Sequence, residues 1–190
     1  MTVRRFCPVI TALFAVAVAA ASVAATTAQA AAAGPSCRAT WGSTPEDTHR
    51  GAGGGWVSQV RSGRHACFDR VVIDVGDGAG LDWYDVRYVD EVRSDGSGAV
   101  VPTRGGTSLQ VALMATSASP YGIYTGVGIN RAELADVTRF RTLRQVVWAG
   151  EFESTSSIGI GTRARLPFRA FTLPGPRGDL RMVVDVAHAW

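Results

Sequence analysis

The chain has 190 residues, 19 basic residues that are all arginine, 16 acidic residues and a formal net charge of +3. Arg4 and Arg5 belong to a segment that we expect to be removed, which leaves 17 basic against 16 acidic residues and a net charge of about +1. This balance argues against a nucleic-acid-binding protein, which needs a basic surface. The absence of lysine, with abundant alanine, glycine and valine, is typical of a GC-rich bacterial genome.

The first 30 residues have the pattern of a secretory signal peptide. Arg4 and Arg5 precede an apolar run over residues 8–25, and a small-x-small cleavage motif follows at residues 28–30. We expect cleavage after Ala30 and a secreted chain that is extracellular or associated with the cell wall. Retention as a membrane anchor is the alternative, because the run approaches the length that spans a bilayer. Its alanine content and the cleavage motif favour removal, so a membrane is expected as a partner only through an uncleaved signal.

Two cysteines, Cys37 and Cys67, remain after removal of the signal, which contains Cys7. In an exported protein two cysteines most simply form one disulfide bond. The bond would tie a glycine-rich segment, residues 31–63, to a β domain expected over residues 64–190. A nucleophilic Cys67 beside His65 is the alternative, which an oxidising compartment disfavours.

Residues 67–76 are predicted to form a buried central strand, because β-branched residues alternate there and both faces carry apolar side chains. Residues 180–186 repeat the pattern of an arginine, valines and an aspartate found at residues 70–74. The sequence therefore predicts that the two strands are neighbours. The alternative is that they look alike because few residue types are common in strands.

The rest of the chain also favours strands. Asn130, followed three residues later by Glu133, is a capping signature that predicts one short helix through about Val137. Residues 117–129 are predicted to form a long surface loop. The fold class expected is all-β, an antiparallel β-sandwich with one short helix, and a small barrel is the alternative. Further strands are expected at residues 56–60, 83–92, 109–113, 140–152, 154–161 and 168–172.

A family resemblance rests on several of these strands. Residues 168–174 (FRAFTLP) and 180–186 (LRMVVDV) resemble the closing half of an AMIN domain. The chain is similar to the AMIN-like domains of secreted actinobacterial proteins over about residues 64–188. The matching stretches are residues 67–74 (CFDRVVID), 86–89 (VRYV), 148–153 (WAGEFE) and 167–169 (PFR).

The resemblance implies a β-sandwich that binds the cell wall, since AMIN domains direct cell-wall amidases and envelope secretion proteins to peptidoglycan. Two features depart from the family. Residues 174–179 contain an inserted glycine and aspartate where the family turn is tight, and the sequence contains no amidase or secretin domain. The departures leave open what a wall-binding module would deliver.

Aromatic and arginine side chains are the candidates for ligand binding. Trp148, Tyr121 and Tyr124 could stack on sugar rings, because aromatic faces suit them. Planar guanidinium groups suit the carboxylates of peptide stems, which makes candidates of Arg163, Arg165 and Arg169. The alternatives are that Trp148 belongs to the core and that the arginines pair with Glu151, Glu153 and Asp179.

We expect a protein that is not an enzyme and has no cofactor and no metal. The three histidines lack the spacing of zinc ligands, and no G-x-S-x-G motif is present. A protein-interaction or inhibitor module that uses residues 117–129 is the second hypothesis. A glycosidase is the third, because Glu151 and Glu153 would lie on one face of a strand, roughly 7 Å apart.

Overall fold

The computed structural model describes residues 37–190 except residues 52, 78–79 and 118–129. The expected signal peptide, Tyr121 and Tyr124 lie outside this part of the chain. Within it the chain forms nine strands and one 3-10 turn (Pro176–Gly178), with no α-helix. In the same residues no helix has the length and apolar composition needed to cross a membrane.

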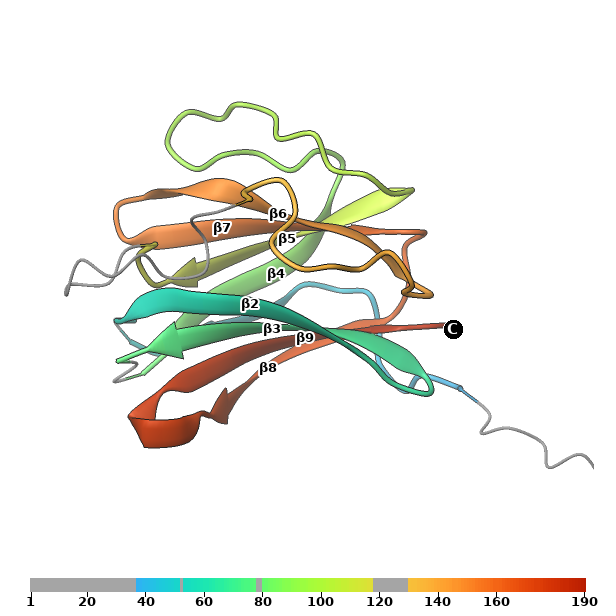
Figure 1. Ribbon diagram of the computed structural model, residues 1–190, viewed down its shortest axis with the longest axis horizontal. Helices are drawn as coiled ribbons and strands as arrows, with labels where there is room; N and C mark the ends of the chain where they lie inside the picture. The colour runs from blue at the N-terminus through green and yellow to red at the C-terminus, as the bar shows by residue number, and fades with distance from the viewer. Residues whose placement is uncertain (1–36, 52, 78–79, 118–129) are drawn as a thin grey trace, which may run out of the picture. The chain divides into compact units, whose positions relative to one another are not determined.

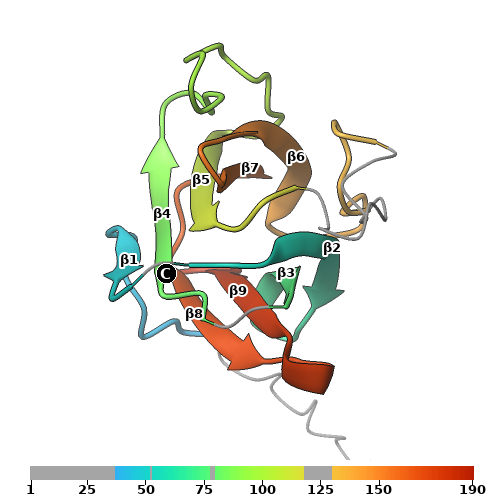
Figure 2. The same cartoon turned by 90° about the vertical axis from the view of Figure 1, so that its left-hand side faces the viewer.

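The strands form two antiparallel sheets that face each other as two layers (Figure 1; Figure 2). The all-β antiparallel prediction is therefore confirmed. The five-stranded sheet has the order β1 (Glu46–His49), β4 (Trp83–Val89), β5 (Thr107–Met114), β7 (Thr155–Thr162) and β6 (Leu143–Phe152). The four-stranded sheet has the order β2 (Trp56–Arg64), β3 (Phe68–Gly76), β9 (Leu180–Ala187) and β8 (Phe168–Pro174).

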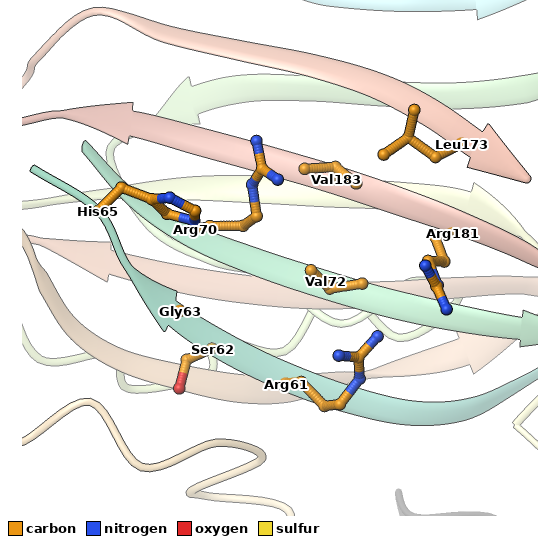
Figure 3. Close-up of a pocket in the computed structure, with 9 residues that line it drawn as sticks. All are labelled: Arg61, Ser62, Gly63, His65, Arg70, Val72, Leu173, Arg181 and Val183. Atoms are coloured by element: carbon orange, nitrogen blue, oxygen red, sulfur yellow. The ribbon is translucent and has the colours of Figure 1, made fainter. Parts of the chain in front are cut away.

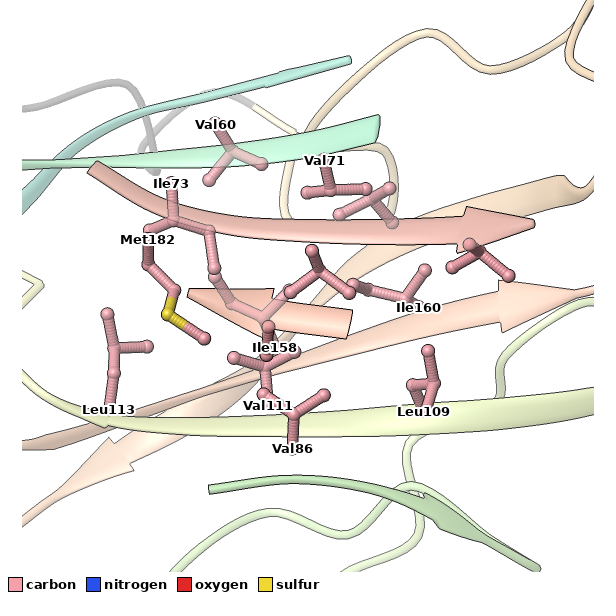
Figure 4. Packing of buried hydrophobic residues seen from close by; sticks show 14 of the residues in the cluster. Val60, Val71, Ile73, Val86, Leu109, Val111, Leu113, Ile158, Ile160 and Met182 are labelled. Carbon is pink, nitrogen blue, oxygen red and sulfur yellow. The ribbon is translucent and has the colours of Figure 1, made fainter. Parts of the chain in front are cut away.

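One hydrophobic core lies between the two sheets. The alternating residues Val71, Ile73 and Val75 of β3 point inward and are fully buried. Leu109 and Leu113 of β5 belong to the same cluster from the opposite sheet (Figure 4). Full burial of such a side chain contributes about 1.5–3 kcal/mol, so this alternation drives the two layers together. The prediction of a central strand is confirmed, because β3 pairs with β2 on one side and with β9 on the other.

The two segments with similar sequences are neighbours, as predicted. β3 and β9 pair in antiparallel register, with Arg70 opposite Asp185 and Asp74 opposite Arg181. The register leaves valines on both sides of the pair, so one set fills the core and the other lies between the charged residues.

The predicted helix after Asn130 is wrong. The residues that follow Asn130 form turns instead, and their backbone groups bond to the edge strand β6. Leu134 N donates to Val146 O over 2.8 Å, and Trp148 N donates to Arg131 O over 2.7 Å. These backbone groups are then not available for the bonds of an α-helix.

A chain segment packs on part of the outer face of the five-stranded sheet. Two glycines of β7 make room for it: a Cβ on Gly159 would lie 2.9 Å from Val92, and one on Gly161 would overlap the carbonyl of Arg104. Arg104 N also donates to the side chain of Gln145 in β6 over 2.6 Å. The segment between Val92 and Arg104 therefore packs on β6 and β7 at the outer face of this sheet.

A buried carboxylate connects the two layers. Asp69 of β3 is only 1% exposed. Its Oδ2 accepts hydrogen bonds from Thr142 N over 2.6 Å and from Leu143 N over 3.3 Å, at the start of β6. Its Oδ1 lies 2.9 Å from Nε2 of His188, which follows β9. The carboxylate therefore satisfies backbone donors of one sheet from a strand of the other.

Cys37 and Cys67 form the expected disulfide bond, with their Cα atoms 4.8 Å apart. The bond closes a loop that contains β1 and β2. Trp41 lies in this loop and packs edge-on against Phe68, with ring centroids 5.7 Å apart. The disulfide therefore holds the start of the described chain against β3.

We predict that Asp69→Ala lowers the free energy of unfolding by about 3 kcal/mol or more, because it leaves buried backbone N–H groups without acceptors. Urea denaturation of the folded chain measures the change. Asp90→Ala is the control, since Asp90 is exposed and should shift stability by no more than about 0.5 kcal/mol. Equal effects of the two substitutions would contradict the role assigned to Asp69.

We predict that the double variant Cys37→Ser/Cys67→Ser loses about 3.5 kcal/mol of stability, the chain-entropy value for a loop of this length. The sequence separation of 30 residues sets that value. Denaturation of the oxidised parent, the reduced parent and the variant makes the comparison. The reduced parent should match the variant, and an unchanged midpoint in either would refute the prediction.

Candidate functional site

The outer face of the β3–β9 pair carries a self-complementary charge pattern. Residues 70–74 of β3 are Arg-Val-Val-Ile-Asp, and residues 181–185 of β9 are Arg-Met-Val-Val-Asp. Each segment points an arginine, a valine and an aspartate outward, so antiparallel pairing sets each arginine opposite an aspartate. The edge strands β2 and β8 each add one arginine to this surface, which we call the arginine face. It consists of Arg61, Arg70, Val72, Asp74, Arg169, Arg181, Val183 and Asp185.

Asp185 holds two arginines at one end of the arginine face. Its side chain is 0% exposed. Arg70 donates to both carboxylate oxygens, Nε to Oδ1 over 2.6 Å and Nη2 to Oδ2 over 2.9 Å. Arg169 of β8 approaches Oδ2 with Nε at 2.9 Å and Nη2 at 2.8 Å. These charge-assisted bonds offset the cost of burying the carboxylate. The hydrogen bond to Asp185 raises the pKa of Arg70, so its guanidinium remains charged.

Aromatic rings hold the same two guanidinium groups from the other side. Cζ of Arg169 lies 4.2 Å from the ring centroid of Trp41 and 5.2 Å from that of Phe171. Cζ of Arg70 lies 5.2 Å from the ring centroid of Phe68. A cation over a ring at such distances is attracted by the ring quadrupole. The two arginines are therefore fixed in orientation by both ion pairs and rings.

Asp74 holds two further arginines at the other end. Arg61 of β2 donates through Nε to Oδ2 over 2.6 Å and through Nη2 to Oδ1 over 2.8 Å. Nε of Arg181 lies 3.4 Å from Oδ1 and is buried without a hydrogen bond in the described part of the chain. The hydrogen bond to Asp74 raises the pKa of Arg61. Asp74 is 17% exposed, so this end is more open to solvent than the end at Asp185.

A groove of about 280 Å³ lies between the two ends. Figure 3 shows Arg70 at one end of it, Arg61 and Arg181 at the other, and Val72 and Val183 between them. A second groove of about 380 Å³ adjoins it on the far side of Arg61 and Arg181. Four arginines and two aspartates give the face a net charge of +2 (4 − 2). The face is therefore an open, positively charged surface with a small apolar floor.

The sequence-predicted ligand residues do not all lie together. Arg169 belongs to the arginine face. Arg163 and Arg165 lie between β7 and β8, where Nη2 of Arg163 donates to His188 O over 2.6 Å and Nη2 of Arg165 donates to Ser43 O over 3.0 Å. Trp148 is 6% exposed and belongs to the core between the sheets. In the described residues, no contact of Arg163 or Arg165 involves the arginine face.

Sequence reasoning missed most of the arginine face. The alternation of residues 70–74 and 181–185 carried a usable signal, because antiparallel pairing of the two segments matches their charges. No local signal pointed to Arg61 or Trp41. Both come from other segments, and their contacts depend on how strands and loops assemble.

The carboxylates considered for glycosidase chemistry occupy structural positions. Oε2 of Glu151 accepts a hydrogen bond from Ser117 N over 2.6 Å. Glu153 and Ser154 form the two-residue turn between β6 and β7, with φ angles of 49° and 65°, as a type I′ turn requires. Among the described residues, no group of three or more His, Cys, Asp or Glu side chains is arranged to hold a metal ion.

We predict that Asp185→Ala costs about 3–5 kcal/mol of stability, because it leaves the partly buried Arg70 without its partner. Asp74→Ala is the matched comparison at the other end, and it should cost about 1 kcal/mol or less because its ion pairs are more exposed. Chemical denaturation of both variants measures the difference. Equal losses would contradict the contrast in burial between the two ends.

Comparison with known families places most of the described chain in one of them. The family model of the AMIN-like domain matches residues 55–188, which include β2 to β9 and the whole arginine face. No curated protein matches the chain, and no solved structure matches it. Because the family model matches more than half of the 190 residues, the chain belongs to the AMIN-like domain family.

Proposed function

We propose that this protein is a secreted, non-catalytic module of the cell envelope that binds peptidoglycan or another wall polymer through the arginine face. Membership of the AMIN-like domain family supports a role at the cell wall. The observation that carries the proposal is an open sheet face on which four arginines are held in place with a net charge of +2. Guanidinium groups in fixed positions are suited to carboxylates or phosphates of a wall polymer.

The arginines are pre-organised for a ligand. Arg61 and Arg70 bind their aspartates through Nε and Nη2, and so does Arg169. Their Nη1 atoms make no hydrogen bond in the described part of the chain and remain available for a ligand. Holding a side chain in its binding orientation reduces the entropy that is lost on binding. The two aspartates therefore serve the proposed site by positioning its cations.

A binding role suits this face better than catalysis. A general base needs a carboxylate that is free to take a proton from the substrate. Both oxygens of Asp185 accept bonds from arginines, and its side chain has no exposure. Both oxygens of Asp74 are held by Arg61. The chemistry that remains on the face is the recognition of anions.

We predict that the mature chain, residues 31–190 with its disulfide formed, sediments with purified insoluble cell wall at physiological salt. The double variant Arg61→Gln/Arg181→Gln should bind at least about tenfold more weakly, because charge-assisted hydrogen bonds to a ligand are worth about 1.5–3 kcal/mol each. A pull-down with graded amounts of wall measures both affinities, and circular dichroism checks that the variant is folded.

The double variant Arg163→Gln/Arg165→Gln is the matched control, because it removes the same two positive charges outside the arginine face. It should bind within about twofold of the parent. Equal weakening of both variants would mean that net charge, and not the arginine face, drives binding. No sedimentation of the parent would overturn the proposed function.

A further inference from the structure

The arginine face also indicates which part of the wall it binds, an inference that rests on the proposed function. We infer that its ligand is the peptide portion of peptidoglycan, recognised as a short peptide with two carboxylates and small apolar side chains between them. The glycan strand would then be held only through its attached peptide.

The first argument is the spacing of the cations. Arg70 and Asp74 are four residues apart on β3, so the two ends of the arginine face are about 13 Å apart. An extended peptide of four residues spans about the same length. Two carboxylates separated by three or four residues can each meet a guanidinium group at one end. A neutral sugar chain has no charged group that could form an ion pair with either end.

The second argument is the groove floor. Val72 and Val183 lie opposite each other between the charged ends. Val72 is partly exposed, whereas Val183 is only 1% exposed and adds little accessible surface. Leu173 of β8 adds an apolar side chain that is 38% exposed. This shallow apolar strip suits methyl-sized side chains such as alanine, because they bury apolar area without leaving polar groups unpaired. The groove thus has charged ends and an apolar middle, and the proposed ligand has carboxylates at its ends and apolar side chains between them.

The third argument is the lack of an open stacking surface for sugar rings. The described residues that line the groove include no tryptophan, tyrosine or phenylalanine. The rings nearest to it already have partners: Arg169 lies over Trp41, and His65 stacks on Phe68 with centroids 4.3 Å apart. Among its described lining residues, the groove therefore offers no tryptophan, tyrosine or phenylalanine face on which a sugar ring could stack.

A phosphate polymer fits the face less well. Such a chain carries a negative charge at each repeat, and charges between the two ends would lie over Val72 and Val183 and close to the two aspartates. The net charge of +2 instead matches two carboxylates, one at each end. The observations therefore favour a dicarboxylate peptide.

The test compares binding to wall preparations that each lack one candidate ligand. The parent chain is incubated with four preparations. They are intact peptidoglycan, glycan strands freed of peptide by an amidase whose newly exposed lactyl carboxylates are then amidated, peptidoglycan whose carboxylates are amidated, and wall stripped of phosphate polymers by hydrofluoric acid. We expect stripping to leave binding unchanged, and removal or amidation of the peptides to weaken it at least about tenfold. The released peptides, added in solution, should compete with intact peptidoglycan.

Each opposite result has a distinct meaning. Full binding to peptide-free glycan would overturn the peptide inference and leave the proposed wall function standing. Loss of binding after phosphate stripping would overturn it in favour of a phosphate polymer. No binding to any wall preparation would overturn both proposals.

A variant links the peptide to the arginine face. Arg61→Gln/Arg181→Gln removes the cations of one end, so amidation of the wall should weaken its binding by a smaller factor than it weakens the parent's. For Arg163→Gln/Arg165→Gln, amidation of the wall should weaken binding by the same factor as for the parent. Equal factors for all three proteins would place the carboxylate contacts outside the arginine face and overturn the inference.

Discussion

The antiparallel register between β3 and β9 is the constraint on which the rest of the structure depends. It sets Val71 and Ile73 toward the core while it places Arg70 opposite Asp185 on the other side of the sheet. A shift of one residue would turn the charged side chains into the core and Val71 and Ile73 outward. Hydrophobic burial and charge pairing therefore select the same register. A register shifted by one residue would satisfy neither of them.

The two sheets differ in what lies on their outer faces. Glycines in β7 allow a segment to pack on part of the five-stranded sheet, whereas β3 and β9 fill the outer face of the four-stranded sheet with arginines and aspartates. Asp69 and Asp185 also show how one sheet accommodates buried carboxylates on both sides. Asp69 is satisfied by backbone N–H groups of the opposite sheet, and Asp185 by two guanidinium groups. Only the second arrangement leaves cationic groups facing solvent.

These features explain how this AMIN-like domain presents oriented cationic side chains without a deep pocket. Without partners, four arginines on one sheet face would repel one another and their side chains would move freely. Two aspartates and a few aromatic rings hold them in fixed orientations and lower the net charge to +2. Partial desolvation of the two ion clusters costs free energy. Short charge-assisted hydrogen bonds between the strands offset this cost.

The sequence by itself determined the all-β class, the central strand at residues 67–76, its likeness to residues 180–186 and the pairing of Cys37 with Cys67. These follow from period-2 alternation and from the small number of cysteines, which are local or countable properties. Only the tertiary structure decided that the segment after Asn130 bonds to β6 instead of forming a helix. It also decided that Trp148 lies in the core while Trp41 covers Arg169. The physical reason is that hydrogen-bond partners and side-chain surroundings come from strands distant in the chain, which a local pattern does not encode.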